Sequence, residues 1–234
     1  KMCSISGYTG NLRAGVLGIF KESLHHRGPD DHGIFEDNLV HLSMNRLAII
    51  DLENGNQPMF NDKRTMVIIF NGEIYNYIEL KKRLNSEGVN FSTSSDTEVV
   101  LKAYEKWGID FLNELNGMYA FAIYDMGISK MILSRDKMGE KPLYYQLSKN
   151  DNDLFFASEY NSLKQITDLN PGEHSNFNYD AAAWYFGYKA MPSEKTISKN
   201  IHKLSPGSFL IYDLKSKKNQ IKKYYSVNSK TKFK

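Results

Sequence analysis

The sequence predicts an α+β fold in which mainly antiparallel sheets lie between outer helices. Hairpins are frequent along the 234 residues: Tyr119–Tyr124 with Lys130–Ser134, and Ser208–Asp213 with Gln220–Tyr225, each alternate as paired strands. Ala120–Ile123 is apolar on both alternations, which indicates a strand covered on both faces. The helices come in two batches instead of alternating with strands, which argues against a doubly wound parallel sheet.

The other elements are predicted from apolar spacing and turn residues. Helices are expected over Ala14–His26, Tyr77–Glu87 and Asp180–Tyr188, and in the segment that follows Ser95. Strands are expected over Cys3–Tyr8, Leu39–Met44, Met66–Phe70, Lys141–Leu147 and Leu154–Ser158, with a loop at 27–31. Ser95 and Glu98 have the spacing of a capping box in front of an apolar run.

The composition excludes several classes of protein. A hydrophobic fraction of 41% with 15 Tyr and 13 Phe is enough for a sizeable core. A single cysteine allows no intrachain disulfide and fits a reducing cytoplasm. No apolar run is long enough to span a membrane. The net charge of +3 comes from residues 215–234, which carry lysines and no acid, and which we interpret as a solvated tail or linker, with neither nucleic acid nor membrane as partner.

Cys3, the one cysteine, follows Lys1 and Met2 at the amino terminus. If Met2 were the true start, its removal would place the thiol and a free α-amine on the same residue. Such an amine has an ordinary pKa of about 7.7–8.0 and can act as a base, which an internal amide cannot. The alternative is a small buried hydrophobe, which is what a lone cysteine usually is.

Three further patterns have both a functional and a structural interpretation. Asn71 and Gly72 follow an apolar strand and suit an oxyanion hole, although Asn-Gly is also a common turn. Arg46 suits bidentate capture of a carboxylate, or an interior ion pair with Asp51. Asp96 suits a ligand ammonium, or a favourable place in the first turn of a helix. The histidines form no clear zinc or Cys–His pattern, so we expect structural roles for them and no metal.

Taken together, the motifs resemble those of the class II glutamine amidotransferase domain, in its glutamine-hydrolysing asparagine synthetase form. The resemblance covers roughly residues 2–214. It is carried, in order, by Met2–Gly7, His26–Asp30, Arg46–Asp51, Gln57-Pro58, Asn71–Asn76, Ser95–Glu98, Leu115–Phe121, Arg135–Tyr145 and Phe156–Glu159. It implies a four-layer αββα amino-terminal-nucleophile hydrolase sandwich with two mainly antiparallel sheets.

The resemblance also implies a reaction and a role for each matching residue. L-Glutamine is the expected substrate, with glutamate and ammonia as products. Cys3 is the expected nucleophile with its own α-amine as base, and Asn71 with the Gly72 N–H resembles the oxyanion donors. The glutamine-binding residues are expected to be Arg46 for the α-carboxylate, Asp96 and Glu73 for the α-ammonium, and the backbone of Leu47, Ala48, Ile49 and Ile50 along the pocket.

Two departures from the family pattern lead to further expectations. Lys1 and Met2 would block the base, so we expect the native enzyme to begin at Cys3. The Ser-Gly-Gly-Leu-Asp-Ser phosphate loop of the synthetase half is not in this chain. We therefore expect residues 2–214 to be a glutaminase domain and 215–234 a linker to an ATP-pyrophosphatase-type synthetase domain or subunit, which would hold ATP and Mg; this chain would need no cofactor.

Other interpretations remain open at this point. The chain could be a non-catalytic glutamine-binding or scaffold module, or the glutaminase half of an amidotransferase of the sugar or purine branches. A papain-like protease is a poorer interpretation, because it needs His174 or His202 beside Cys3. For the oligomeric state, a homodimer is one of the alternatives.

Overall fold

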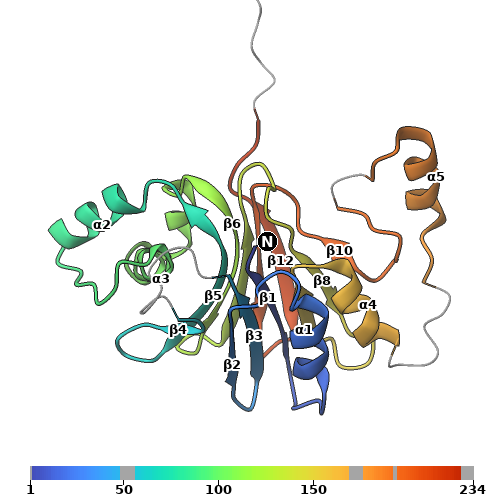
Figure 1. Ribbon diagram of the computed structural model, residues 1–234, viewed down its shortest axis with the longest axis horizontal. Coiled ribbons are helices and arrows are strands. Elements are labelled where there is room, and N and C mark those ends of the chain that lie inside the picture. The colour runs from blue at the N-terminus through green and yellow to red at the C-terminus, as the bar shows by residue number, and fades with distance from the viewer. Residues whose placement is uncertain (1, 48–55, 169–175, 192–193, 228–234) are drawn as a thin grey trace, which may run out of the picture.

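Two six-stranded sheets lie face to face, and helices cover their outer sides (Figure 1). The computed structural model describes residues 2–47, 56–168, 176–191 and 194–227. Every strand pair among these residues is antiparallel. The predicted α+β fold of two antiparallel sheets between helical layers is confirmed.

The chain builds each sheet from segments that are distant in sequence. The first sheet has the order β10-β8-β9-β1-β3-β2 and the second β12-β11-β7-β6-β5-β4. The strands of the first sheet are β1 Ser4–Thr9, β2 Asp31–Glu36, β3 Val40–Arg46, β8 Tyr144–Leu147, β9 Leu154–Ala157 and β10 His202–Lys203. Those of the second are β4 Met59–Phe60, β5 Met66–Ile74, β6 Gly117–Asp125, β7 Lys130–Arg135, β11 Ser208–Asp213 and β12 Lys218–Lys223.

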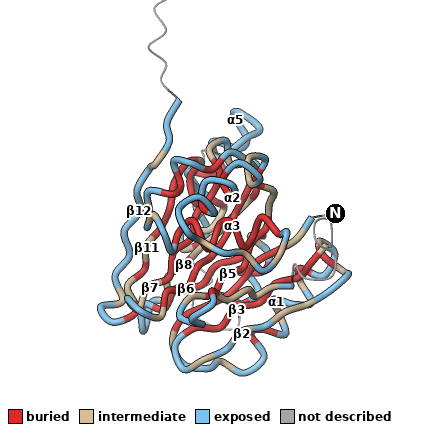
Figure 2. The backbone as a smooth tube through the Cα atoms, turned by 90° about the vertical axis from the view of Figure 1, so that its left-hand side faces the viewer, coloured by how far each residue is buried: buried red, intermediate tan, exposed pale blue. Residues whose placement is uncertain are grey.

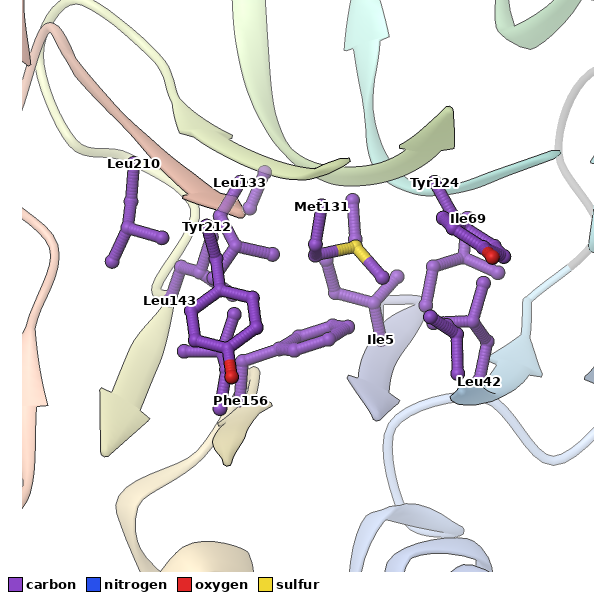
Figure 3. Packing of buried hydrophobic residues seen from close by; sticks show 14 of the residues in the cluster. Ile5, Leu42, Ile69, Tyr124, Met131, Leu133, Leu143, Phe156, Leu210 and Tyr212 are labelled. Carbon is purple, nitrogen blue, oxygen red and sulfur yellow. The ribbon is translucent and has the colours of Figure 1, made fainter. Parts of the chain in front are cut away.

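The central core fills the space between the sheets. Figure 3 shows Ile5 and Leu42 of the first sheet facing Ile69 and Met131 of the second. Burial of such side chains is the main favourable term in folding. Because both sheets contribute to this one core, it fixes their relative position, and Figure 2 shows the strands as the most buried part of the chain.

The strand predicted to be covered on both faces is β6. Ala120 and Ala122 face the core between the sheets, whereas Phe121 and Ile123 pack beneath helices on the other side. Each of these four side chains is fully buried. The two alternating sets of β6 therefore belong to two different layers, as the apolar pattern predicts.

Helices close the outer layers, and the helix at 179–188 stands apart (Figure 1). Apolar side chains of α1 and α4 pack on the first sheet, and those of α2, α3 and the 3₁₀ helix η1 on the second. The bounds are α1 Val16–Leu24, α2 Tyr77–Ser86, α3 Asp96–Trp107, η1 Gly108–Asn113, α4 Tyr160–Asp168 and α5 Tyr179–Tyr188. Among the described residues no helix has the length and apolar character needed to cross a membrane.

The structure adds elements to those expected from the sequence. β2, β4, β10, α4 and η1 were not predicted, and the other elements lie where they were expected, with ends that differ by a few residues. Strand β12 lies within the segment 215–234, and all six of its residues pair with β11. The paired sheet thus extends beyond residue 214, into the lysine-bearing segment.

Candidate active site

A cavity opens to solvent where the ends of the two sheets meet. The pairing of Ser4 with Asn45 places Cys3, just before β1, beside Arg46 at the end of β3. Strand β5 and the first turn of α3 form the opposite wall. The cavity is lined by Cys3, Arg46, Leu47, Gln57, Phe70, Gly72, Glu73, Ser95, Asp96 and Thr97. Six of the residues predicted for the site therefore meet in one cavity; Ala48, Ile49 and Ile50 lie outside the described residues.

The thiol of Cys3 is held by the backbone of Leu47. Its Sγ accepts a hydrogen bond from Leu47 N at 3.3 Å and donates to Leu47 O at 3.4 Å. Burial raises the pKa of the Cys3 thiol, while the Leu47 N–H and the charges of Arg46 and Lys141 act in the opposite direction. A thiol with a raised pKa is protonated at neutral pH, so a nucleophilic role requires a base next to it.

The residues before β1 are held by Arg27, in the loop after α1. Arg27 Nε donates to Cys3 O at 3.2 Å, and Met2 N donates to Arg27 O at 3.1 Å. Arg27 Nη1 forms an ion pair with Glu159 at 3.0 Å. Both residues stand in motifs of the resemblance, but neither was predicted to have a role in the site. The motifs containing Arg27 and Glu159 are visible in the sequence. Their ion pair joins positions 132 residues apart, so no local spacing indicates it.

Asn71 and Gly72 lie near the end of β5, paired with Ala120 and Tyr119 of β6. A Cβ on Gly72 would lie 2.3 Å from Met118 O, so only glycine fits at this position. Asn71 is buried, and its Nδ2 has no hydrogen-bond partner among the described residues. An unpaired buried amide is unfavourable and calls for an explanation, and a donor reserved for a bound oxygen supplies one. Asn71 itself does not line the cavity, whereas Gly72 does.

Acidic side chains occupy the wall formed by β5 and α3. Asp96 is only 5% exposed, and its Oδ2 accepts a hydrogen bond from Ile74 N at 3.0 Å. Burial, and to a smaller extent the charge of Glu73, raises the pKa of Asp96 to about 6, although the Ile74 and Thr97 N–H groups oppose this. A carboxylate with this environment is stabilised by a cation, which makes the wall suitable for an ammonium group.

Arg46 supplies the opposite charge. It is buried at the end of β3, and its Nη1 donates to Asn56 Oδ1 at 2.8 Å. The alternative partner Asp51 lies outside the described residues. A guanidinium and two carboxylates, Asp96 and Glu73, around one cavity match the two charges of an amino-acid zwitterion.

Gln57 also lines the cavity, although it was not among the residues predicted for the site. Its Oε1 accepts from Phe70 N at 2.6 Å, and its Nε2 donates to Thr97 Oγ1 at 3.2 Å. The side chain therefore ties β5 to the start of α3. Only the motif Gln57-Pro58 pointed to it, because an amide side chain has no distinctive pattern in a single sequence.

Four of the described histidines make side-chain contacts, and their partners are residues other than Cys3. His32 and His41 bond to Ser43 Oγ and Gly10 O, and His26 contacts Glu159. His202 packs against the ring of Tyr145, and His174 lies outside the described residues. Within the described residues there is no cluster of three metal-ligating side chains. These contacts support structural roles and do not support a papain-like pairing with Cys3.

Comparison with known proteins gives one consistent family. Residues 2–225 match the family described as the glutamine amidotransferase domain. The chain is similar to the glutamine-hydrolysing asparagine synthetase 2 of Bacillus subtilis, with 36% identity over 97% of this chain and 31% of that protein. It is also 40% identical, over 96% of its length, to a protein of Methanocaldococcus jannaschii provisionally named a glutamine-hydrolysing asparagine synthetase, of which it covers 46%.

The solved structures agree on the fold. The glutamine phosphoribosylpyrophosphate amidotransferase of Bacillus subtilis superposes with a TM-score of 0.66 at 20% identity, over 97% of this chain and 50% of that one. At this identity the likeness concerns the fold alone. The present chain spans less than half the length of the two relatives described above.

Proposed function

Because the chain belongs to the glutamine amidotransferase domain family, we propose that it hydrolyses L-glutamine to glutamate and ammonia, with Cys3 as nucleophile. The observation that carries the proposal is that the thiol of Cys3, the guanidinium of Arg46 and the carboxylate of Asp96 line one cavity. That arrangement offers a nucleophile at one place and complementary charges for an amino acid at another.

Glutamine would be held by its two charged ends. Arg46 receives the α-carboxylate, and Asp96 with Glu73 receives the α-ammonium. Leu47, and Ala48 to Ile50 beyond the described part, would contribute backbone groups. Positioning of this kind accounts for a large share of enzymatic rate enhancement, because the reacting groups no longer need to find each other.

The reaction proceeds through a thioester. The α-amine of Cys3 takes the thiol proton, and the sulfur attacks the side-chain amide carbon of glutamine. Asn71 Nδ2 and the Gly72 N–H stabilise the oxyanion of the tetrahedral intermediate; loss of one such donor typically lowers the rate by about 10²–10³. The amine returns the proton to the leaving nitrogen, ammonia departs, and water hydrolyses the thioester to glutamate.

The relatives' names and lengths support a use for the ammonia. We infer that it supplies ATP-dependent asparagine synthesis from aspartate, in a synthetase domain or subunit outside this chain, where ATP and Mg would bind. A cytoplasmic location fits this metabolic role and the single thiol.

The test is a glutaminase assay on a chain that begins at Cys3. We expect equal amounts of glutamate and ammonia from this chain, and no turnover in Cys3→Ala. In a control chain that retains Met2, the nitrogen of Cys3 is an amide and cannot act as a base, so we expect a rate about 10²–10⁴-fold lower. Absence of glutamate release from the trimmed chain would overturn the proposal.

A second function is favoured by one observation: with Met2 attached, its N–H is bonded to Arg27 and the nitrogen of Cys3 is a peptide amide. In that form the chain would be a glutamine-binding module without turnover. Thermal stabilisation by glutamine in both forms, with hydrolysis in neither, would identify that function.

A further inference from the structure

A buried lysine with no acidic partner lies beside the residues that precede β1. Lys141 is only 6% exposed, and its Nζ contacts Met2 Sδ at 3.0 Å. A thioether is a weak hydrogen-bond acceptor, and no carboxylate among the described residues pairs with this ammonium. Buried ammonium groups are normally paired, so this one calls for an explanation.

The backbone of Lys141 is fixed at both ends by buried charged side chains. Its N–H donates to Asp136 Oδ2 at 2.9 Å, and its carbonyl accepts from Arg135 Nε at 2.7 Å. Arg135 Nη1 also donates to Leu204 O at 2.7 Å, and Asp136 Oδ1 accepts from Glu140 N at 2.9 Å. The loop that carries Lys141 is therefore built to hold one conformation, with its ammonium directed at the amino-terminal segment.

A second cation contacts the same segment. Arg27 holds Cys3 O through Nε, while its Nη2 is buried without a hydrogen-bond partner among the described residues. The charge of Arg27 reinforces burial in lowering the pKa of Lys141, as expected for cations that are close together. Cys3 thus lies close to the charges of Arg27 and Lys141, with Arg46 on the cavity side.

The nearby acids offset these charges in part. Glu159 is paired with Arg27, whose charge it offsets, and also contacts His26. Both carboxylate oxygens of Asp136 accept backbone N–H groups. Glu140, on the same loop as Lys141, is exposed, so water screens its charge. The charges of Arg46 and Lys141 both favour the thiolate of Cys3.

We propose that Lys141 is a positioning residue whose buried ammonium keeps the terminal amine of Cys3 neutral and opposes the effect of burial on its thiol. The inference rests on the proposed function, because it takes Cys3 as the first residue. A positive field disfavours the ammonium form of the amine, whose pKa is ordinarily about 7.7–8.0, and favours the thiolate. The first effect increases the fraction of the enzyme in which the amine can accept a proton, and the second makes transfer of the thiol proton more favourable.

The test measures the ionisation of Cys3 directly, in three chains that begin at Cys3. Since Cys3 is the only cysteine, the rate of iodoacetamide alkylation against pH reports on this thiol alone. We expect Lys141→Met, which keeps the length of the side chain but not its charge, to move the midpoint upward by about one pH unit. Lys141→Arg, which keeps the charge, should restore the parent midpoint. If Lys141→Met does not fold, Lys141→Gln gives the same comparison.

The glutaminase pH profile is the second readout. We expect the acidic limb of kcat/KM in Lys141→Met to move to higher pH, with a rate about tenfold lower below that limb and parent-like activity above it. An unmoved alkylation midpoint in the uncharged variant would overturn the inference, whatever the activity. If the alkylation midpoint moved in Lys141→Met but none of the chains hydrolysed glutamine, the effect of Lys141 on Cys3 would stand and the proposed function would be refuted.

Discussion

At the scale of single residues, the site holds charges that the fold would be more stable without. Asp96 is the clearest case, because burial raises the pKa of its carboxyl from 3.8 to about 6. Between these values the folded chain binds more protons than the unfolded chain, so stability falls as pH rises through this window. Above pH 6 the ionised carboxylate destabilises the free chain by about 3 kcal/mol, and a bound ammonium would offset this.

Asp96→Asn is therefore expected to stabilise the free chain while weakening glutamine binding. The amide oxygen can still accept the hydrogen bond from Ile74, and the buried charge is gone. At pH 7 we expect a gain of about 1–3 kcal/mol, or a few degrees in Tm, measured by thermal unfolding. The gain should vanish near pH 4, where the native carboxyl is also neutral. An equal gain at both pH values, or a loss at pH 7, would contradict this account.

At the scale of elements, the start of α3 is what places Asp96 and Thr97 in the cavity. Ser95 caps the helix, but its Oγ accepts from Thr97 N at 3.2 Å instead of from Glu98 N. Glu98 reaches back to Ser92 N at 2.8 Å and Thr93 N at 2.7 Å, so the predicted capping box is wrong in its partners. The acidic residue fixes the preceding loop instead of closing the helix on itself.

Glu98→Ala should accordingly affect both stability and binding. Its buried carboxylate accepts three hydrogen bonds, and their loss leaves two backbone N–H groups unpaired, for which we expect about 2–4 kcal/mol of destabilisation by urea unfolding. Because the first turn of α3 would lose its support, we expect a higher KM for glutamine with a smaller change in kcat. The exposed Glu22 of α1 provides the control, and Glu22→Ala should leave both quantities near the parent values. An unchanged KM in Glu98→Ala would show that the loop does not position the site.

The elements also show how far the sequence could predict this protein. Strands with strong apolar alternation, such as β5, β6 and β7, and helices with clear periodicity, such as α3, were predicted because local pattern and tertiary environment agree. Strand β2 begins at Asp31, the last residue of the predicted loop, and its register is set by pairing with β3. The two residues of β4 are too few to leave a pattern.

The site likewise combines residues that local motifs predict with contacts that they do not. Cys3, Arg46, Gly72 and Asp96 stand in recognisable motifs, and the structure brings them into one cavity. The clamp of Arg27 on Cys3 and the approach of Lys141 join distant parts of the chain. Such contacts depend on how the loops at the ends of the two sheets meet, which no local spacing records.

At the scale of the whole molecule, the site depends on the core that joins the two sheets. Cys3 is attached to the first sheet, and Asn71 and Gly72 belong to the second, so the distance between nucleophile and oxyanion donors is set by the packing in between. Helix α5 has no comparable influence on this distance. Its aromatic side chains are exposed, including Trp184 at 46%, and Figure 2 shows it at the margin of the buried region.

Leu42→Ala and Trp184→Ala should therefore differ in both stability and activity. Leu42 is fully buried between the sheets, and removing its side chain should destabilise the chain by about 2–5 kcal/mol through lost burial and a cavity. The sheets would also pack less tightly, so we expect kcat/KM for glutamine to fall at a temperature where the variant is still folded. Trp184→Ala removes a larger side chain that is 46% exposed and lies outside the core, and we expect less than about 1 kcal/mol of destabilisation and parent-like turnover. Urea unfolding measures the stability of both variants, and steady-state assays measure their turnover. If Trp184→Ala lost as much turnover as Leu42→Ala, the geometry of the site would depend on more than the core between the sheets.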